Sequence, residues 1–269
     1  MRANIYLHEL SARTRSVIVW SVATAALVFV FSSLFPGFSS QAATLKEIFA
    51  RMPPALLAAF GMQGTDMSTP LGFYGFVFVF VQLCLAIQAG NYGFGLVSIE
   101  ESELTADFLM SKPVSRGSIM TSKLLAAATG LVITNLVVWA ITFASFGLFM
   151  KGQSYAVGTL VLVLAGIIIF QLFFLGVGLV ISLFVRRVRS VTPYSLALGF
   201  GMYFLSAFSG VLAEAKLEYI TPFKHLDPAA IVRNAALDTR LVLPDIAVSL
   251  VAVAVSYWLY LRRDIQAVS

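Results

Sequence analysis

Six long apolar segments without a charged residue constrain this chain more than any other feature of its sequence. A helix that crosses a membrane needs about 20 consecutive apolar residues, because the hydrocarbon core of a bilayer is about 30 Å thick. The segments therefore predict an all-α polytopic membrane protein with six transmembrane helices, which form one transmembrane domain over residues 1–269. The six predicted spans are residues 17–36, 71–98, 124–150, 155–185, 191–213 and 246–261.

The composition agrees with this interpretation. Hydrophobic residues make up 59% of the chain and charged residues 12%, whereas soluble domains carry about 25% charged residues. Cys84 is the only cysteine, so no intramolecular disulfide can form. The first span also imitates a signal peptide, because Arg13 and Arg15 precede it and the sequence Ser-Gln-Ala at 40–42 follows it. Its apolar run is longer than a usual signal peptide core, which favours a retained span.

The distribution of Lys and Arg predicts the orientation of the chain. Eleven of these residues fall on one side of the predicted spans and seven on the other, and the richer side is expected to be cytoplasmic. Both termini and the polar segment 99–123 are therefore predicted in the cytoplasm, with segments 37–70 and 214–245 outside. The net charge of +5 indicates contact with anionic lipid headgroups. It does not indicate nucleic acid, because no basic stripe lies on a folded domain.

Three segments outside the spans contain apolar side chains that predict interfacial structure. Residues 3–16 suit a short helix on the cytoplasmic interface, or else a frayed tail. Residues 44–61 have the spacing of two short amphipathic helices on the outer surface. The Pro-rich and aromatic stretch 219–228 is compatible with a partly inserted or interfacial segment, and equally with an ordinary external loop.

The second span is rich in glycine and also carries three amides. Its glycines would allow another helix to approach the backbone closely. The amides are expected to form hydrogen bonds between helices, with contact to a substrate as the alternative. The residues that line a pathway or pack helices in this interpretation are Gln82, Gln88 and Asn91.

Several kinds of chemistry have no support in the sequence. The predicted spans contain no ionisable residue of the kind that a proton- or sodium-driven carrier uses, and no phosphate-binding loop or hydrolase motif occurs. We therefore predict no catalytic residue. We also predict no metal site, because His225 and His8 are expected on opposite faces. If the protein moves a substrate uphill, the energy comes from another chain.

The segment 99–123 is a concentrated polar region between two apolar spans. Acidic residues gather near its start, at what the sequence suggests is the N-terminus of a helix, where carboxylates interact favourably with the helix dipole. A proline then ends this helix, and Ser115 is a plausible N-cap for a second helix that continues through Lys123. The pattern predicts a helical hairpin that docks onto a soluble partner. The alternative is a solvated loop whose charges only set the topology.

Residues 100–116, which read EESELTADFLMSKPVSR, together with Lys123, resemble the cytoplasmic segment of ABC-2 type permeases. Leu104 stands where that family usually has glycine and Asp107 where it usually has glutamate. Residues 53–74 and 222–228 are also similar to that family. The resemblance implies an ABCG-like, type V exporter fold with both termini in the cytoplasm.

The resemblance also implies partners and a function. The chain would pair with a second permease, identical or different, and with two cytoplasmic ABC ATPase subunits that bind ATP and Mg²⁺. It would itself bind no cofactor and would export a substrate. Apart from the resemblance, the apolar spans with scattered amides would suit a hydrophobic or amphipathic substrate, and equally suit helices packed only on one another. The alternatives are a membrane scaffold or sensor that recruits a cytoplasmic partner without transport, and a stand-alone channel. The residues expected to couple to the ATPase are Glu100, Glu101, Glu103, Asp107, Pro113, Arg116 and Lys123.

Overall fold

The computed structural model describes residues 3–53, 56–57, 62, 65–102, 114–185, 190–212 and 219–262. Within these ranges the chain is helical and contains no strand. Six helices are long and apolar enough to cross a membrane, which confirms the predicted number of spans. They are α1 (Ala3–Ser40), α4 (Pro70–Ser102), α6 (Arg116–Phe149), α7 (Val157–Phe184), α8 (Val191–Leu212) and α11 (Thr239–Arg262). Three shorter helices are α2 (Ala42–Arg51), α9 (Pro222–His225) and α10 (Pro228–Asn234).

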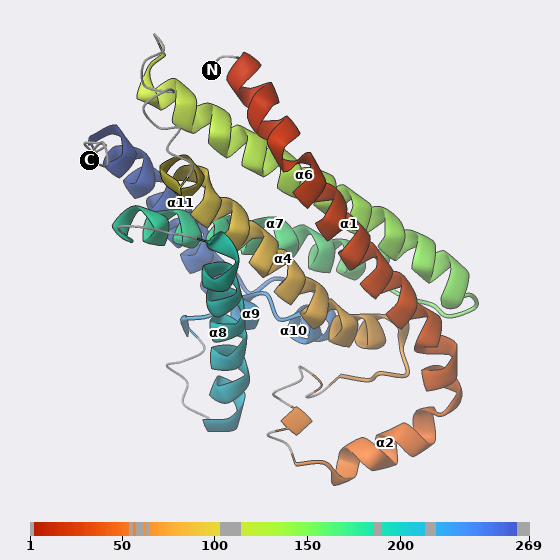
Figure 1. Cartoon of the computed structure of the whole chain (residues 1–269). Helices are drawn as coiled ribbons and strands as arrows, with labels where there is room; N and C mark the ends of the chain where they lie inside the picture. The colour runs from red at the N-terminus through yellow and green to blue at the C-terminus, as the bar shows by residue number, and fades with distance from the viewer. Residues whose placement is uncertain are drawn as a thin grey trace.

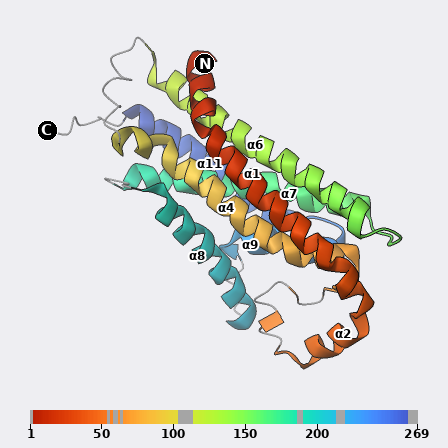
Figure 2. The same cartoon turned by 45° about the vertical axis from the view of Figure 1, so that its right-hand side comes forward.

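Helix α4 is the centre of the bundle and the most buried of the six long helices. Helices α1 and α6 run side by side along one flank of α4, and α8 lies on the other flank. Helix α7 packs behind α4, and α11 packs against α7 (Figures 1 and 2). At one end of the bundle α1 begins, α4 ends, α6 begins and α11 ends; we call this the terminal end. The opposite end carries α2, and we call it the α2 end (Figure 1).

The helices extend beyond the apolar segments that predicted them. Helix α1 is continuous from Ala3, so the separate interfacial helix or frayed tail expected over residues 3–16 is wrong. Helix α11 begins at Thr239 rather than at residue 246. An apolar run marks only the part of a helix that lipid can surround, whereas backbone hydrogen bonding continues through polar residues with adequate helix propensity. Helix α2 confirms the first of the two amphipathic helices expected over 44–61; most of the second lies outside the described residues.

Glycines allow α4 to pack closely against α7 and α8, as the sequence predicts. A Cβ atom on Gly93 would collide with the carbonyl oxygen of Leu175 in α7. A Cβ atom on Gly178 would lie 3.2 Å from the carbonyl oxygen of Gly90, and one on Gly90 would lie 3.3 Å from the Cβ of Ser195 in α8. Small residues at these crossings bring backbones into contact, which is a main source of helix association in lipid.

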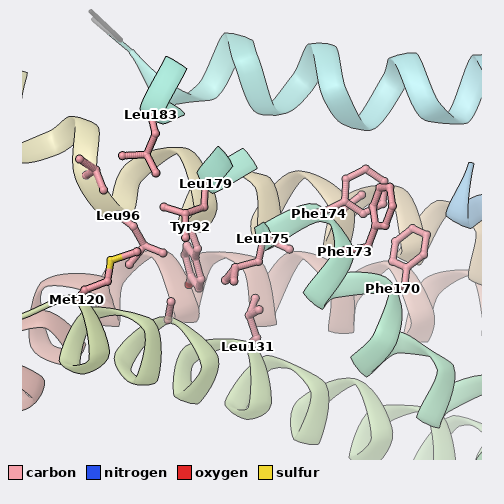
Figure 3. Packing of buried hydrophobic residues seen from close by; sticks show 14 of the residues in the cluster. Tyr92, Leu96, Met120, Leu131, Phe170, Phe173, Phe174, Leu175, Leu179 and Leu183 are labelled. Atoms are coloured by element: carbon pink, nitrogen blue, oxygen red, sulfur yellow. The ribbon is translucent and has the colours of Figure 1, made fainter. Parts of the chain in front are cut away.

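Apolar side chains from α4, α6 and α7 meet along the centre of the bundle (Figure 3). Tyr92 and Leu96 come from α4, Met120 and Leu131 from α6, and Leu179 from α7. All five side chains are buried. This cluster fills the space between the three helices near the terminal end and fixes their relative positions.

The segment that contains α9 and α10 enters the bundle instead of lying across it. The ring of Phe223 contacts the rings of Phe170 and Phe174 in α7, with centroids 4.9 and 5.9 Å apart. The side chain of Gln82 donates a 2.8 Å hydrogen bond to the carbonyl oxygen of Leu226, and Gln82 lies about 18 Å along α4 from its first residue. The geometry favours the partly inserted segment over the ordinary loop. Irregular backbone is tolerated at this depth because protein surrounds it.

Candidate functional site

The two ends of the polar segment 99–123 are the last turn of α4 and the first turns of α6. Glu100 and Glu101 lie at the C-terminal end of α4, so the expectation that they begin a helix is wrong: no helix-breaking residue separates them from the apolar part of α4. At the other end, the Ser115 hydroxyl accepts the N–H of Ser118 at 3.3 Å, as expected for the N-cap of α6. Arg116 is half-buried in the first turn. Glu103, Asp107 and Pro113 lie outside the described residues.

Lys123 lies inside the bundle rather than on the surface. Its side chain is 3% exposed, and Nζ donates a 2.8 Å hydrogen bond to the carbonyl oxygen of Leu96 near the end of α4. The same Nζ lies 3.8 Å from Oε1 of Glu9 in α1. One ammonium group therefore contacts two helices besides its own, close to where the polar segment begins and ends.

Glu9 extends this contact along α1. Its Oε2 lies 3.5 Å from Nη2 of Arg13, one helical turn away. The Arg13 guanidinium lies over the ring of Tyr92 in α4, 5.3 Å from the centroid, which is within the range of a cation–π interaction. Sequence reasoning missed Glu9 and Arg13, although their spacing of four residues is the signal of an ion pair on one helix face.

Helix α11 joins the same end of the bundle through Tyr257. Its hydroxyl donates to the carbonyl oxygen of Gly117 at 3.0 Å and lies 3.2 Å from Oγ1 of Thr121. Both partners are in the first turns of α6, within the last part of the polar segment. The ends of α1, α4, α6 and α11 are thus connected by polar contacts in addition to apolar packing. We call the residues Glu9, Arg13, Leu96, Gly117, Lys123 and Tyr257 the terminal clamp.

The amides of α4 make polar contacts with neighbouring elements. Gln88 Nε2 donates to Oγ1 of Thr134 in α6 at 2.8 Å, and Gln82 bonds to Leu226 as described above. Asn91 is half-buried, and its Oδ1 has no hydrogen-bond partner among the described residues. A third amide contact, between Nδ2 of Asn135 and Oε1 of Gln171, joins α6 to α7 at 2.8 Å.

A buried ionisable pair lies in the part of the bundle where the sequence predicted none. Nδ1 of His225 in α9 lies 2.8 Å from Oδ1 of Asp245 in α11, and both side chains are almost fully buried. The expectation that the spans contain no ionisable group is therefore wrong, because α11 starts earlier than its apolar run. Nothing in the sequence links two residues 20 positions apart, so only the fold could reveal this pair.

A pocket of about 400 Å³ opens at the α2 end, between α2 on one side and Leu57, Met62 and residues 65–68 on the other. Apolar side chains such as Leu45, Phe49 and Met67 line most of it, with Lys46 and Asp66 at its polar part. The hydroxyl and the N–H of Ser68 both donate to Asp66 Oδ1, at 2.6 and 2.9 Å. These bonds hold the pKa of the Asp66 carboxyl below its usual value. No group of three or more His, Cys, Asp or Glu side chains that could hold a metal ion occurs among the described residues.

Comparison with known proteins identifies the family. The sequence profile described as "ABC-2 family transporter protein" matches residues 3–265, which is almost the whole chain. No curated protein matches the chain. The match and the six apolar helices together identify a multi-pass integral membrane protein of the cell membrane. The match also supports the role of permease in an ABC transporter, and a permease of this family is not itself catalytic. The chain belongs to the ABC-2 family of transporter proteins.

Proposed function

We propose that this chain is the membrane subunit of an ATP-driven exporter and that a separate cytoplasmic ATPase moves it through the polar segment 99–123. ATP and Mg²⁺ would bind the ATPase, and the acidic residues Glu100, Glu101, Glu103 and Asp107 would contact it, with Pro113 and Arg116 completing the docking surface. A second permease copy or paralogue would complete the transporter. The excess of Lys and Arg near the terminal end supports placing this segment in the cytoplasm.

The observation that carries the proposal is the terminal clamp. A docked partner can move membrane helices only if the docking segment is attached firmly to them. Lys123 connects the start of α6 to the carbonyl oxygen of Leu96 at 2.8 Å, so the two ends of the segment are held together. Glu9 adds α1 to this unit and Tyr257 adds α11. A force that the partner applies to the segment would therefore displace α1, α4, α6 and α11 together.

Lys123 has a different role in this proposal from that of the acidic residues. Its ammonium group is buried against α1 and α4, so it acts through the position of the hairpin rather than by touching the ATPase. Lys123 is therefore a positioning residue, whereas the acidic residues would touch the partner.

The substrate class rests on a separate observation. The pocket at the α2 end is mainly apolar and has one cationic and one anionic side chain, Lys46 and Asp66, in its lining. An amphipathic molecule would bury its apolar part there and present a polar group to these charges. This supports export of a hydrophobic or amphipathic substrate.

Charge reversal tests the docking surface. The full chain is expected to co-purify with a cytoplasmic ABC ATPase. Reversing Glu100, Glu101 and Glu103 to Lys together should abolish co-purification, and with it the ATPase activity recovered with the chain. The matched control reverses three exposed charges outside the pocket, Glu47, Arg51 and Lys151, which lie at the opposite end and should leave both measurements unchanged. Undiminished co-purification and activity in the first variant would contradict the proposal. A chain that binds a cytoplasmic partner without any ATPase would be the scaffold or sensor instead.

A further inference from the structure

The buried pair His225–Asp245 joins α9 to α11, two helices that α10 separates in the chain. His225 is the last residue of α9, and Asp245 lies in the second turn of α11. Their Nδ1 and Oδ1 atoms are 2.8 Å apart. The neighbouring carbonyl oxygen of Leu226 accepts a hydrogen bond from Gln82 in α4. The pair therefore closes a contact between α9, α11 and α4 inside the bundle.

The contact holds the α9–α10 segment in place. Behind the pair, Phe223 packs on the aromatic rings of α7, and Leu226 is fully buried beside Gly166 of α7. At the other side, Ala229 of α10 lies against Gly75 of α4. Apart from these apolar contacts, the described hydrogen bonds that dock the segment on α4 and α11 are those of Gln82 and of the pair.

No other described charge neutralises Asp245. In α9 and α10, Lys224 is half-buried and Arg233 is exposed. The side chain of Asp227 is occupied in capping α10, because it accepts the N–H of Ala229 at 3.0 Å. In α11, Arg240 is exposed. Helices α7 and α8 contain no Asp, Glu, Lys, Arg or His, and those of α4 and α6 lie at the terminal end, far along each helix. Among the described residues, the ion pair of Asp245 is with His225 alone.

Because Asp245 has no other described counter-charge, the number of protons bound to the pair determines whether a net charge is buried there. With one proton shared between them, whether on the imidazole or on the carboxyl, the pair has no net charge. Without that proton a carboxylate remains in the bundle with a neutral imidazole, and a buried charge that lacks a counter-charge is strongly destabilising. Nε2 of His225 and Oδ2 of Asp245 have no hydrogen-bond partner among the described residues, so nothing else compensates for the loss. Ionisable groups at membrane depth are functional sites by default.

We propose that the His225–Asp245 pair is a proton-binding site that controls the docking of the α9–α10 segment. One bound proton keeps the segment in the bundle, and loss of the proton releases the segment so that water reaches the carboxylate. The site opens or closes the α2 half of the bundle according to pH. This inference goes beyond the proposed coupling to an ATPase, because it concerns the opposite half of the bundle and does not require a partner.

A cysteine reporter in the full purified chain tests the inference. Cys84 is first changed to Ala, and Ala229→Cys then places a thiol at a position that is 4% exposed. Asn234→Cys, at the exposed end of the same helix, is the matched control. Both variants react with a water-soluble thiol reagent, and the rate of Ala229→Cys is divided by that of Asn234→Cys. This ratio removes the effect of pH on thiol chemistry. In the native pair we expect this ratio to rise as the pH is raised.

Two substitutions should have opposite effects. His225→Gln leaves the carboxylate alone, so the ratio at neutral pH should rise about 100-fold, as expected when one partner of a buried ion pair is removed. Acidification should return it toward the native value, because the carboxyl becomes neutral; only a folded protein can show this recovery. Asp245→Asn keeps a hydrogen-bonding partner for the imidazole and removes the charge, so the ratio should stay low from neutral to alkaline pH.

The outcomes separate a proton site from a structural hydrogen bond. A ratio that is independent of pH in the native protein would overturn the inference. So would an Asp245→Asn variant that opens as far as His225→Gln, or one whose ratio still rises at alkaline pH. Co-purification with an ATPase is measured in parallel and should be unchanged in both variants, so failure of this inference is distinct from failure of the proposed function.

Discussion

The Nζ atom of Lys123 lies 2.8 Å from the carbonyl oxygen of Leu96, so the first turns of α6 are bonded directly to the end of α4. The polar segment 99–123 begins in α4 and ends in α6. A cation at the C-terminal end of a helix also interacts favourably with the helix dipole. This single contact makes the two ends of the segment one mechanical unit, and the predictions about the terminal clamp depend on it.

Replacing Lys123 with Met should loosen the clamp. The change removes a hydrogen bond from a charged donor, which is worth about 1.5–3 kcal/mol, and leaves Glu9 with Arg13 as its described ion-pair partner. We expect a lower melting temperature of the purified chain and reduced ATPase activity in the complex, with co-purification retained. Lys151→Met, at an exposed position, is the matched control and should change stability by less than about 0.5 kcal/mol. Equal melting temperatures for the two variants would contradict the clamp.

The orientation of the chain can be measured with single cysteines in a Cys84→Ala background. Ser115 and Lys151 are exposed positions before and after α6. Because cationic flanks resist translocation, a membrane-impermeant maleimide should label Ser115→Cys from the cytoplasmic side only and Lys151→Cys from the outside only. The reverse pattern would invert the assignment and remove the basis for docking a cytoplasmic ATPase on segment 99–123.

Gly93→Ala should destabilise the crossing of α4 and α7. The added methyl group would collide with the Leu175 carbonyl oxygen, and overpacking of this kind costs about 1–3 kcal/mol. Gly147→Ala in α6 is the control, because a Cβ there meets nothing within 4 Å and alanine has the higher helix propensity. Thermal unfolding of both variants should show a loss for the first and no loss for the second.

The hydrogen bond between Asn135 and Gln171 provides a direct measure of polar association between α6 and α7. A double-mutant cycle with Asn135→Ala and Gln171→Ala should give a coupling energy between about 0.6 and 1.7 kcal/mol, which are the average and the maximum for hydrogen bonds between membrane helices. The described bond is 2.8 Å long, so the value should lie in the upper part of that range. A coupling energy of zero in equilibrium unfolding would mean that the two amides do not interact in the membrane.

Much of the architecture could be predicted from the sequence because lipid imposes a simple rule on length and polarity. Six apolar runs gave six helices, the glycines of α4 marked the close helix crossings at Gly90 and Gly93, and Ser115 marked the start of α6. The helix ends were less predictable. Polar residues such as Glu100 and Thr239 continue a helix without any apolar signal, so the acidic residues expected to begin a helix instead end one.

The sequence by itself determined the membrane class and the number of spans, because these follow from local length and polarity. Only the tertiary structure decided which polar groups meet. Lys123 faces Leu96 and Glu9, and His225 faces Asp245 across 20 residues of sequence. Such pairs depend on how helices cross and on how a segment re-enters the bundle. Packing between distant parts of the chain sets that geometry, and no local pattern records it.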